Sequence, residues 1–166
     1  MSHFNTIIGK IQTRNQLSQT VLGWKNKKLR IVFTNGCFDL LHRGHADYLS
    51  KAADLGDKLV IGLNSDASVS KLKGPHRPIT DQDSRAFLLA SLAFVDAVVI
   101  FDEDTPADLI NLVRPDVLVK GGDYEPKDIV GYDTVIARGG EVIALPLVKG
   151  YSTTDIETRI VAGRDK

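Results

Sequence analysis

The chain carries, at positions 35–45, the stretch Asn35-Gly36-Cys37-Phe38-Asp39-Leu40-Leu41-His42-Arg43-Gly44-His45. An apolar segment rich in β-branched and aromatic residues, 29–34, precedes it, and its composition predicts a buried strand that Gly36 ends. Apolar residues at helical spacing follow at 46–55 and predict an amphipathic helix. The quoted stretch is therefore predicted to be the turn that leads from a strand into a helix.

Two histidines of this turn, His42 and His45, stand three residues apart with Gly44 between them. The first turn of a helix has backbone N–H groups without intrahelical partners and the positive end of the helix dipole, so anions bind there. Gly44 lets a phosphate approach the backbone closely, and both imidazoles can donate hydrogen bonds to it. The pattern predicts a phosphate site whose histidines stabilise charge during phosphoryl chemistry.

Two other interpretations of the histidines stay open at this point. They could bind zinc, although H-x-G-H lacks the glutamate and the spacing of H-E-x-x-H, and the single Cys37 offers no second thiolate. They could also be ordinary helix-cap or half-buried residues. Cys37 itself is predicted to be a small buried residue rather than a nucleophile.

The composition of the 166 residues is that of one globular domain, which should bury roughly 70% of the surface of its unfolded chain. The 21 basic and 21 acidic residues cancel, so broad electrostatic capture of nucleic acid or of a membrane is disfavoured. One cysteine excludes an intrachain disulfide, and no signal peptide or long apolar span is recognisable. We expect a cytoplasmic protein.

Strands and helices are predicted to alternate after a helical arm at residues 1–28, followed by one domain at 29–166. Further strands are expected at 58–63, 97–101, 117–119 and 141–145, and helices at 84–94, 105–113 and 129–138. Because hairpin signals are absent, this order predicts a parallel sheet with right-handed crossovers, an α/β Rossmann-like, doubly wound fold. Ligands of such sheets bind beyond the carboxyl ends of the strands.

Three further motifs follow predicted strands. Within the segment 71–78, the five residues 73–77 are predicted to form a mobile basic loop that binds a phosphate, or else a solvated turn. Arg85, at the start of a helix, opposes the dipole and suggests a phosphate contact, with a surface salt bridge to Asp81 or Asp83 as the alternative. Lys120-Gly121-Gly122-Asp123-Tyr124 allows close ligand approach, with Asp123 and Tyr124 as hydrogen-bonding groups.

A run of hydroxyls, Ser152-Thr153-Thr154, precedes a helix that is expected to continue towards Val161. Ser152 or Thr153 would be a good helix cap, and three hydroxyls at a helix start also suit a phosphate. The sequence contains neither a G-x-x-x-x-G-K-[ST] loop nor a G-x-G-x-x-G fingerprint, so P-loop enzymes and dinucleotide-binding enzymes are disfavoured.

The string G-C-F-D-L-L-H-R-G-H resembles the nucleotidyltransferase superfamily related to class I tRNA synthetases, in its cytidylyltransferase-like branch. V-K-G-G-D-Y is typical of the members that activate heptose phosphates, and the S-T-T run resembles the second family motif. Leu147 and Lys149 stand where relatives with R-T-E-G-I-S-T-T have arginine and glutamate, which puts a glycerol-phosphate cytidylyltransferase in doubt.

The resemblance implies roles for individual residues. The implied catalytic residues are His42, His45, Lys71 and Arg85. The implied contacts of the substrate phosphate are Lys71, Lys73 and Arg77. The implied nucleotide-binding residues are Asn35, Gly36, Cys37, Phe38, Asp39, Gly44, Lys120, Gly121, Gly122, Asp123, Ser152, Thr153 and Thr154. No resident metal site is expected, and Mg²⁺ is expected to accompany ATP.

The resemblance also implies a reaction, the transfer of AMP from ATP to D-glycero-β-D-manno-heptose 1-phosphate, which yields ADP-heptose and pyrophosphate for lipopolysaccharide assembly. A sugar phosphate is already an anionic nucleophile and needs no general base. A cytidylyltransferase, an FAD synthetase-like enzyme and a non-catalytic nucleotide-binding module are the alternatives. We expect a separate heptose kinase in the same pathway, a homodimer at the level of the family, and no nucleic-acid or membrane partner.

Overall fold

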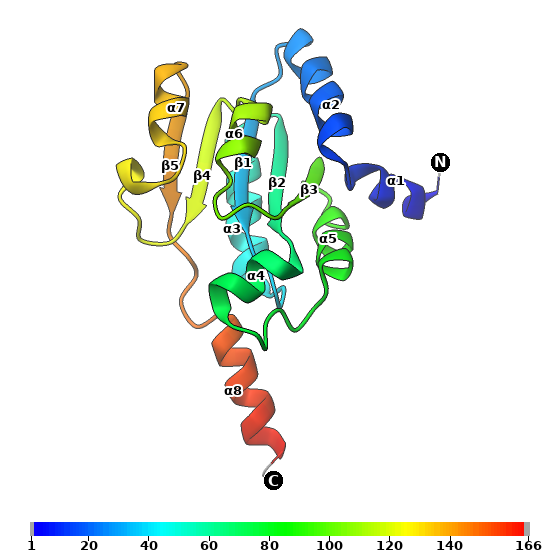
Figure 1. Cartoon of the computed structure of the whole chain (residues 1–166), viewed down its shortest axis with the longest axis vertical. Helices are drawn as coiled ribbons and strands as arrows, with labels where there is room; N and C mark the ends of the chain where they lie inside the picture. The colour runs from blue at the N-terminus through cyan, green and yellow to red at the C-terminus, as the bar shows by residue number, and fades with distance from the viewer. Residues whose placement is uncertain (1, 165–166) are drawn as a thin grey trace.

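The computed structural model describes residues 2–164 and has a parallel sheet of five strands between two layers of helices (Figure 1). The strand order is β3-β2-β1-β4-β5, so the order reverses between β1 and β4. The strands are β1 (Ile31–Gly36), β2 (Lys58–Asn64), β3 (Ala97–Phe101), β4 (Val117–Gly121) and β5 (Glu141–Leu145). The predicted doubly wound fold and all five predicted strands are confirmed.

The helices occupy the segments between the strands and both ends of the described chain. They are α1 (His3–Lys10), α2 (Arg14–Asn26), α3 (Arg43–Ala53), α4 (Asp66–Lys73), α5 (Gln82–Ala90), α6 (Ala107–Val113), α7 (Tyr132–Ala137) and α8 (Thr153–Arg164), with one turn of 3₁₀-helix at Pro126–Asp128. The sequence missed α4, for it predicted no helix between β2 and α5.

Alternate residues of each strand face opposite layers, as the period of two requires. In β1, Val32 packs with α3 and α5 on one face, while Ile31 and Phe33 pack with α2, α6 and α7 on the other. Both faces are buried, which explains the nearly continuous apolar runs that made the strands recognisable. The layers leave the carboxyl edge of the sheet free for a ligand.

The described part of the arm, residues 2–28, packs against the sheet. Leu17 and Val21 of α2 are buried in the core, and the backbone N–H of Gln12 donates to the carbonyl of Val98 on the edge strand β3 at 2.9 Å. The arm thereby covers the exposed edge of the sheet. The division into an arm and a domain stays a prediction, and positions 1 and 165–166 of it lie outside the described residues.

Candidate active site

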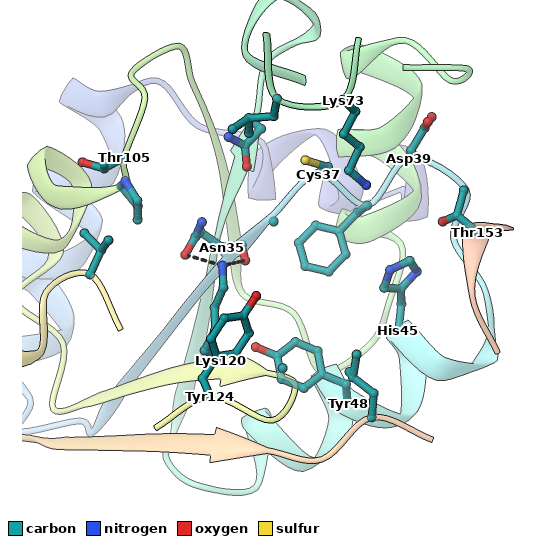
Figure 2. Close-up of a pocket in the computed structure, with 18 of the residues that line it drawn as sticks. Asn35, Cys37, Asp39, His45, Tyr48, Lys73, Thr105, Lys120, Tyr124 and Thr153 are labelled. Atoms are coloured by element: carbon teal, nitrogen blue, oxygen red, sulfur yellow. Dashed lines mark hydrogen bonds between the residues drawn. The ribbon is translucent and has the colours of Figure 1, made fainter. Parts of the chain in front are cut away.

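A cavity of about 460 Å³ lies at the carboxyl ends of β1 and β4, where the strand order reverses (Figure 2). This is where ligands bind in doubly wound sheets, and the volume is within the range of small-molecule sites. The predicted site residues that line it are Asn35, Gly36, Cys37, Phe38, Asp39, His45, Lys73, Lys120, Gly121 and Thr153. The cavity therefore gathers four of the sequence motifs at one place.

The two histidines form a reciprocal cap at the start of α3. The Nδ1 atom of His42 accepts from the backbone N–H of His45, and the Nδ1 atom of His45 accepts from the backbone N–H of His42, both at 3.4 Å. The rings stack with centroids 3.8 Å apart. Since both Nδ1 atoms are acceptors, we assign the proton of each neutral ring to Nε2. The two histidines are thus helix-cap residues, as the second interpretation held, and the same backbone bonds determine the tautomer of both rings.

Both imidazoles are neutral at pH 7. Burial, together with the charge of Lys73 and that of His42 when it is protonated, lowers the pKa of His45 to about 4, against an opposing contribution from the Leu40 carbonyl. Burial also lowers the pKa of His42, which the carboxylate of Asp155 partly opposes. The histidines can therefore donate hydrogen bonds to a phosphate without holding a positive charge of their own.

The turn before α3 is tightly folded around Phe38. This residue has a φ of +46°, a conformation that L residues seldom adopt, and its ring meets the ring of His45 edge-on at 5.3 Å. A Cβ at Gly36 would lie only 3.0 Å from the Phe38 ring. Gly36 thus leaves room for the Phe38 ring at the end of the strand, where the ring packs against the ring of His45.

Lys120 supplies a cation at the centre of the cavity. Its Nζ donates to the carbonyl and to the side-chain oxygen of Asn35, at 3.3 and 3.4 Å. Burial lowers its pKa, with an opposing contribution from Cys37. Within residues 2–164 no carboxylate pairs with this ammonium. A half-buried cation held only by neutral oxygens suits an anionic ligand. Cys37 is half-buried in the cavity wall rather than a core residue.

The predicted basic loop is in part helical. Lys71 and Lys73 lie in the last turn of α4, which Ser65 caps by accepting from the N–H of Ser68. Lys73 lines the cavity, whereas the exposed Lys71 has only a distant contact with Asp104, 3.9 Å away. Because helical geometry points the two lysines in different directions, the structure brings one of them to the site and not the other.

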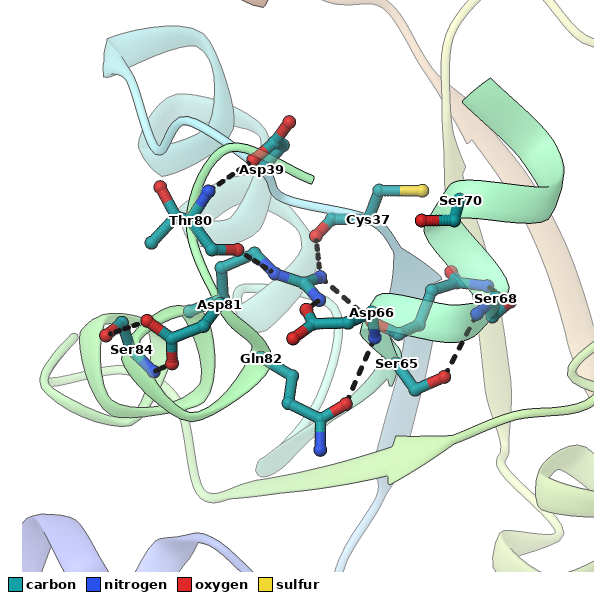
Figure 3. A network of polar contacts seen from close by, with 12 residues as sticks. Cys37, Asp39, Ser65, Asp66, Ser68, Ser70, Thr80, Asp81, Gln82 and Ser84 are labelled. Atoms are coloured by element: carbon teal, nitrogen blue, oxygen red, sulfur yellow. Dashed lines mark hydrogen bonds and ion pairs between the residues drawn. The ribbon is translucent and has the colours of Figure 1, made fainter. Parts of the chain in front are cut away.

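Arg85 does not line the cavity, and the predicted surface salt bridge to Asp81 or Asp83 is wrong. Its side chain is 0% exposed. The guanidinium donates to the carboxylate of Asp66 and to three backbone carbonyls, at positions 37, 64 and 80 (Figure 3). Asp81 instead caps α5. Four of five N–H donors are thus occupied by the protein, so Arg85 holds the cavity's walls together.

Arg77, which was expected to contact the substrate phosphate, instead pairs with two carboxylates. One nitrogen donates to Asp39 at 2.7 Å and the other to Glu157 of α8. Asp39 also accepts from the N–H groups of Ile79 and Thr80, at 2.8 and 3.0 Å. Burial alone would raise the pKa of Asp39, but the hydrogen bonds from Thr80, Arg77 and Ile79 lower it below its usual value. Asp39 is therefore ionised and organises the turn before α5.

The hydroxyl run lies where the sequence predicted, at the start of α8. Ser152 caps the helix, because its Oγ accepts from the N–H of Asp155 at 3.0 Å, and Thr153 lines the cavity. Ser152 and Thr154 are not part of the cavity wall. Tyr151 packs so closely on α3 that a Cβ at Gly44 would lie 3.1 Å from the Tyr151 Cβ. The contact brings the hydroxyl run next to the histidine pair.

The glycine pair after β4 makes a tight turn. Gly122 has a φ of +124°, which favours glycine, and Tyr124 lies over it close enough that a Cβ would be 2.9 Å from the tyrosine ring. Gly121 and Tyr124 line the cavity, whereas the exposed Asp123 does not. The contact predicted for Asp123 stays a prediction.

Sequence reasoning missed several cavity residues. Tyr48 lies on α3 three residues after His45, and its buried hydroxyl bonds to Thr34 and to the carbonyl of Val119. Burial raises the pKa of Tyr48 to about 12. Asp104 and Thr105 follow β3 at the same edge of the sheet. Helical spacing from His45 and the rule on strand carboxyl ends would have found all three.

The described residues contain no group of three or more His, Cys, Asp or Glu side chains that could hold a metal ion. None of the helices within residues 2–164 is long and apolar enough to cross a bilayer.

Comparison with known proteins shows the family. The model of the Cytidylyltransferase-like family matches residues 33–159. The bifunctional protein HldE of Caulobacter vibrioides is 54% identical over 151 residues, which are 91% of this chain and 31% of that protein. HldE of Campylobacter concisus is 56% identical over 151 residues, with the same coverage. The chain spans about a third of the length of these relatives.

Two solved structures are similar. The lipopolysaccharide core biosynthesis protein of Thermoplasma volcanium superposes with a TM-score of 0.60 at 28% identity, covering 75% of this chain and 99% of that one. The pantoate-beta-alanine ligase of Francisella tularensis, with a TM-score of 0.58 at 15% identity over 90% and 76% of the two chains, shares the fold. With H-x-G-H at the switch point of its sheet and the family model matched over most of its length, the chain belongs to the cytidylyltransferase-like family of nucleotidyltransferases.

Proposed function

We propose that the chain transfers AMP from ATP to D-glycero-β-D-manno-heptose 1-phosphate and releases pyrophosphate, giving ADP-heptose for lipopolysaccharide assembly. The observation that best supports this proposal is the cavity at the topological switch point of the sheet, which His45, Lys120 and Thr153 line together. The heptose branch is favoured by V-K-G-G-D-Y, by Leu147 in place of the family arginine and by the similarity to HldE.

The acceptor phosphate attacks the α-phosphorus of ATP, the bond from that phosphorus to the bridging oxygen breaks, and pyrophosphate leaves with the electron pair. No proton must be removed from the nucleophile, so the protein's contribution is alignment and neutralisation of charge. His45 in the cavity wall, and His42 stacked on it, would donate hydrogen bonds, while Lys73 and Lys120 would provide positive charge. Ser152, Thr153 and Thr154 offer the start of α8 to the triphosphate.

Mg²⁺ belongs to this proposal as an ion that enters with ATP. The donor set fits such an ion, because Mg²⁺ is usually held by phosphate oxygens, water and one or two carboxylates. Of the two lining carboxylates, Asp39 already accepts three hydrogen bonds, whereas Asp104 is 88% exposed, has only the 3.9 Å contact with Lys71 and could contribute. When bound, the ion would neutralise charge on the phosphates.

The proposal also includes a separate kinase in the same pathway, the cytosol as the compartment and a homodimer. ATP and a sugar phosphate as substrates support the compartment, and similarity to proteins described as bifunctional supports a second activity in the pathway.

Pyrophosphate release tests the nucleotide. The wild-type chain is mixed with heptose 1-phosphate and Mg²⁺, and ATP is compared with CTP. We expect release with ATP. Release with CTP alone would keep the fold and the chemistry but would overturn the adenylyl transfer, and binding of ATP without release in the presence of any phosphorylated acceptor would favour a nucleotide-binding module.

A further inference from the structure

Helix α8 is held in place by very few contacts. None of its described side chains is fully buried, and Ile160 and Val161 are 55% and 62% exposed. Figure 1 shows the helix projecting from the carboxyl edge of the sheet. Since apolar burial does not fix the helix, polar contacts near its first turns must set its position.

Besides the packing of Tyr151 on Gly44, two polar side-chain contacts join this part of the chain to the body. Just before the helix, the hydroxyl of Tyr151 accepts from Arg43 of α3 at 2.9 Å. In its second turn, Glu157 pairs with the Arg77 guanidinium. Thr153, which reaches the cavity, lies between these two points. The orientation of its hydroxyl therefore depends on both contacts.

Arg77 connects α8 to the turn that carries the histidines. Its second nitrogen bonds to Asp39, a carboxylate with 0% exposure that lies three residues before His42. A guanidinium holds two carboxylates in a fixed planar geometry, which a lysine ammonium does not. The turn that carries the histidines and the start of α8, two neighbouring walls of the phosphate site, thus share one link, Asp39 to Arg77 to Glu157.

We propose that Arg77 is a positioning residue that holds the hydroxyls of α8 at a fixed distance from the histidine pair, and that the link to Glu157 thereby determines the affinity for ATP. The inference rests on the proposed function, because the triphosphate is the ligand that would touch both walls. When the walls of the site are already ordered before ATP binds, binding loses less conformational entropy and the affinity is higher. Arg77 acts through its carboxylates and makes no contact with the nucleotide itself.

The substitution Glu157→Gln tests the link and leaves the buried pair of Arg77 with Asp39 intact. Calorimetry with ATP and Mg²⁺ should show a dissociation constant about three- to tenfold above that of the wild type, as expected for a partly buried charged contact. The kcat at saturating ATP should stay within about twofold. The matched control is Glu141→Gln, which breaks the exposed pair with Arg30 away from the cavity and should change neither value.

A double-mutant cycle separates positioning from a general structural effect. If Glu157 acts by placing the Thr153 hydroxyl, then Glu157→Gln should have little further effect in a Thr153→Val background. Arg77→Lys, which keeps the charge but not the fork, should resemble Glu157→Gln. An unchanged ATP affinity in Glu157→Gln, or full additivity with Thr153→Val, would overturn the inference alone. Failure of the wild type to bind ATP would overturn the proposed function together with it.

Discussion

The histidines of the site differ from a pair of cations in a way that matters for catalysis. Their reciprocal backbone bonds put the proton on Nε2, and burial keeps both rings neutral. In the proposed reaction, the neutral rings would stabilise a developing oxyanion by hydrogen bonding, while Lys73 and Lys120 would supply the charge. The proposed site thus divides the two tasks between the histidines and the lysines of α4 and β4.

Replacement of His45 by alanine should lower kcat by about 10², the usual cost of losing one oxyanion donor. The steady-state rate of pyrophosphate release measures the change, and circular dichroism checks that the variant folds. His3→Ala, at an exposed position on α1, is the control and should retain the wild-type rate. Undiminished turnover in folded His45→Ala would remove His45 from the catalytic residues.

Stability should depend on the protonation of His45. The pKa of His45 is about 4 in the folded protein, whereas an ordinary histidine has a pKa of 6.5. Between pH 4 and pH 6.5 the unfolded chain therefore binds the proton more readily than the folded protein does. The free energy of unfolding is therefore highest above about pH 6.5 and falls by up to about 3 kcal/mol as the pH approaches 4. Urea unfolding of wild type and His45→Gln at a series of pH values measures this. Identical pH profiles would contradict it.

At the residue scale, the sequence predicted the types of groups in the site better than their partners. H-x-G-H and the hydroxyl run were recognisable because they are local. The partners of Arg85 and Arg77 were not, since Arg85 bonds to Cys37, 48 residues away, and Arg77 to Asp39, 38 residues away. A charged side chain in a sequence suggests a ligand and a buried ion pair equally well, and only the fold decides between them.

At the scale of elements, α4 shows why a short helix escapes detection. Its eight residues carry only two large apolar side chains, Val69 and Leu72, of which Val69 alone is buried. Tertiary contact and the cap at Ser65 stabilise the helix more than its own periodicity does. The strands were easier to predict, because burial on both faces makes their apolar runs continuous.

The contact of Tyr151, just before α8, with α3 makes Gly44 sensitive to substitution. In Gly44→Ala the new Cβ would lie 3.0 Å from the His42 ring and 3.1 Å from the Tyr151 Cβ, so the ring and the segment that leads into α8 must shift by a few tenths of an ångström. We expect ATP affinity to fall roughly fivefold, measured by calorimetry. The control is Gly23→Ala on α2, where nothing lies within 4 Å, and it should leave ATP binding unchanged. Equal affinities in both variants would show that the two helices adjust freely.

At the scale of the whole molecule, alternation of strands and helices was enough to predict the doubly wound sheet, and that sheet placed the cavity. The strand order and the tight packing of the arm could not be predicted from the sequence. For the arm, the reason is that an amphipathic pattern shows that a helix has an apolar side but not which surface of the protein that side packs against. α2 proves to be part of the core through Leu17 and Val21.

The arm should therefore contribute to global stability. Leu17 is 0% exposed, so Leu17→Ala should lower the free energy of unfolding by about 2–5 kcal/mol. Leu22→Ala, on the same helix but 54% exposed, should change it by less than about 0.5 kcal/mol. Urea denaturation measures both. Similar values for the two would mean that the arm does not belong to the folding unit.

The fate of the α-phosphate of ATP distinguishes adenylyl transfer from phosphoryl transfer. ATP labelled at the α-phosphorus is incubated with heptose 1-phosphate, Mg²⁺ and the wild-type chain, and the products are separated. We expect the label to move into ADP-heptose, in step with the release of unlabelled pyrophosphate. Label recovered in free ADP, with the terminal phosphate on the sugar, would contradict it, because the γ-phosphorus and not the α-phosphorus would then have been attacked.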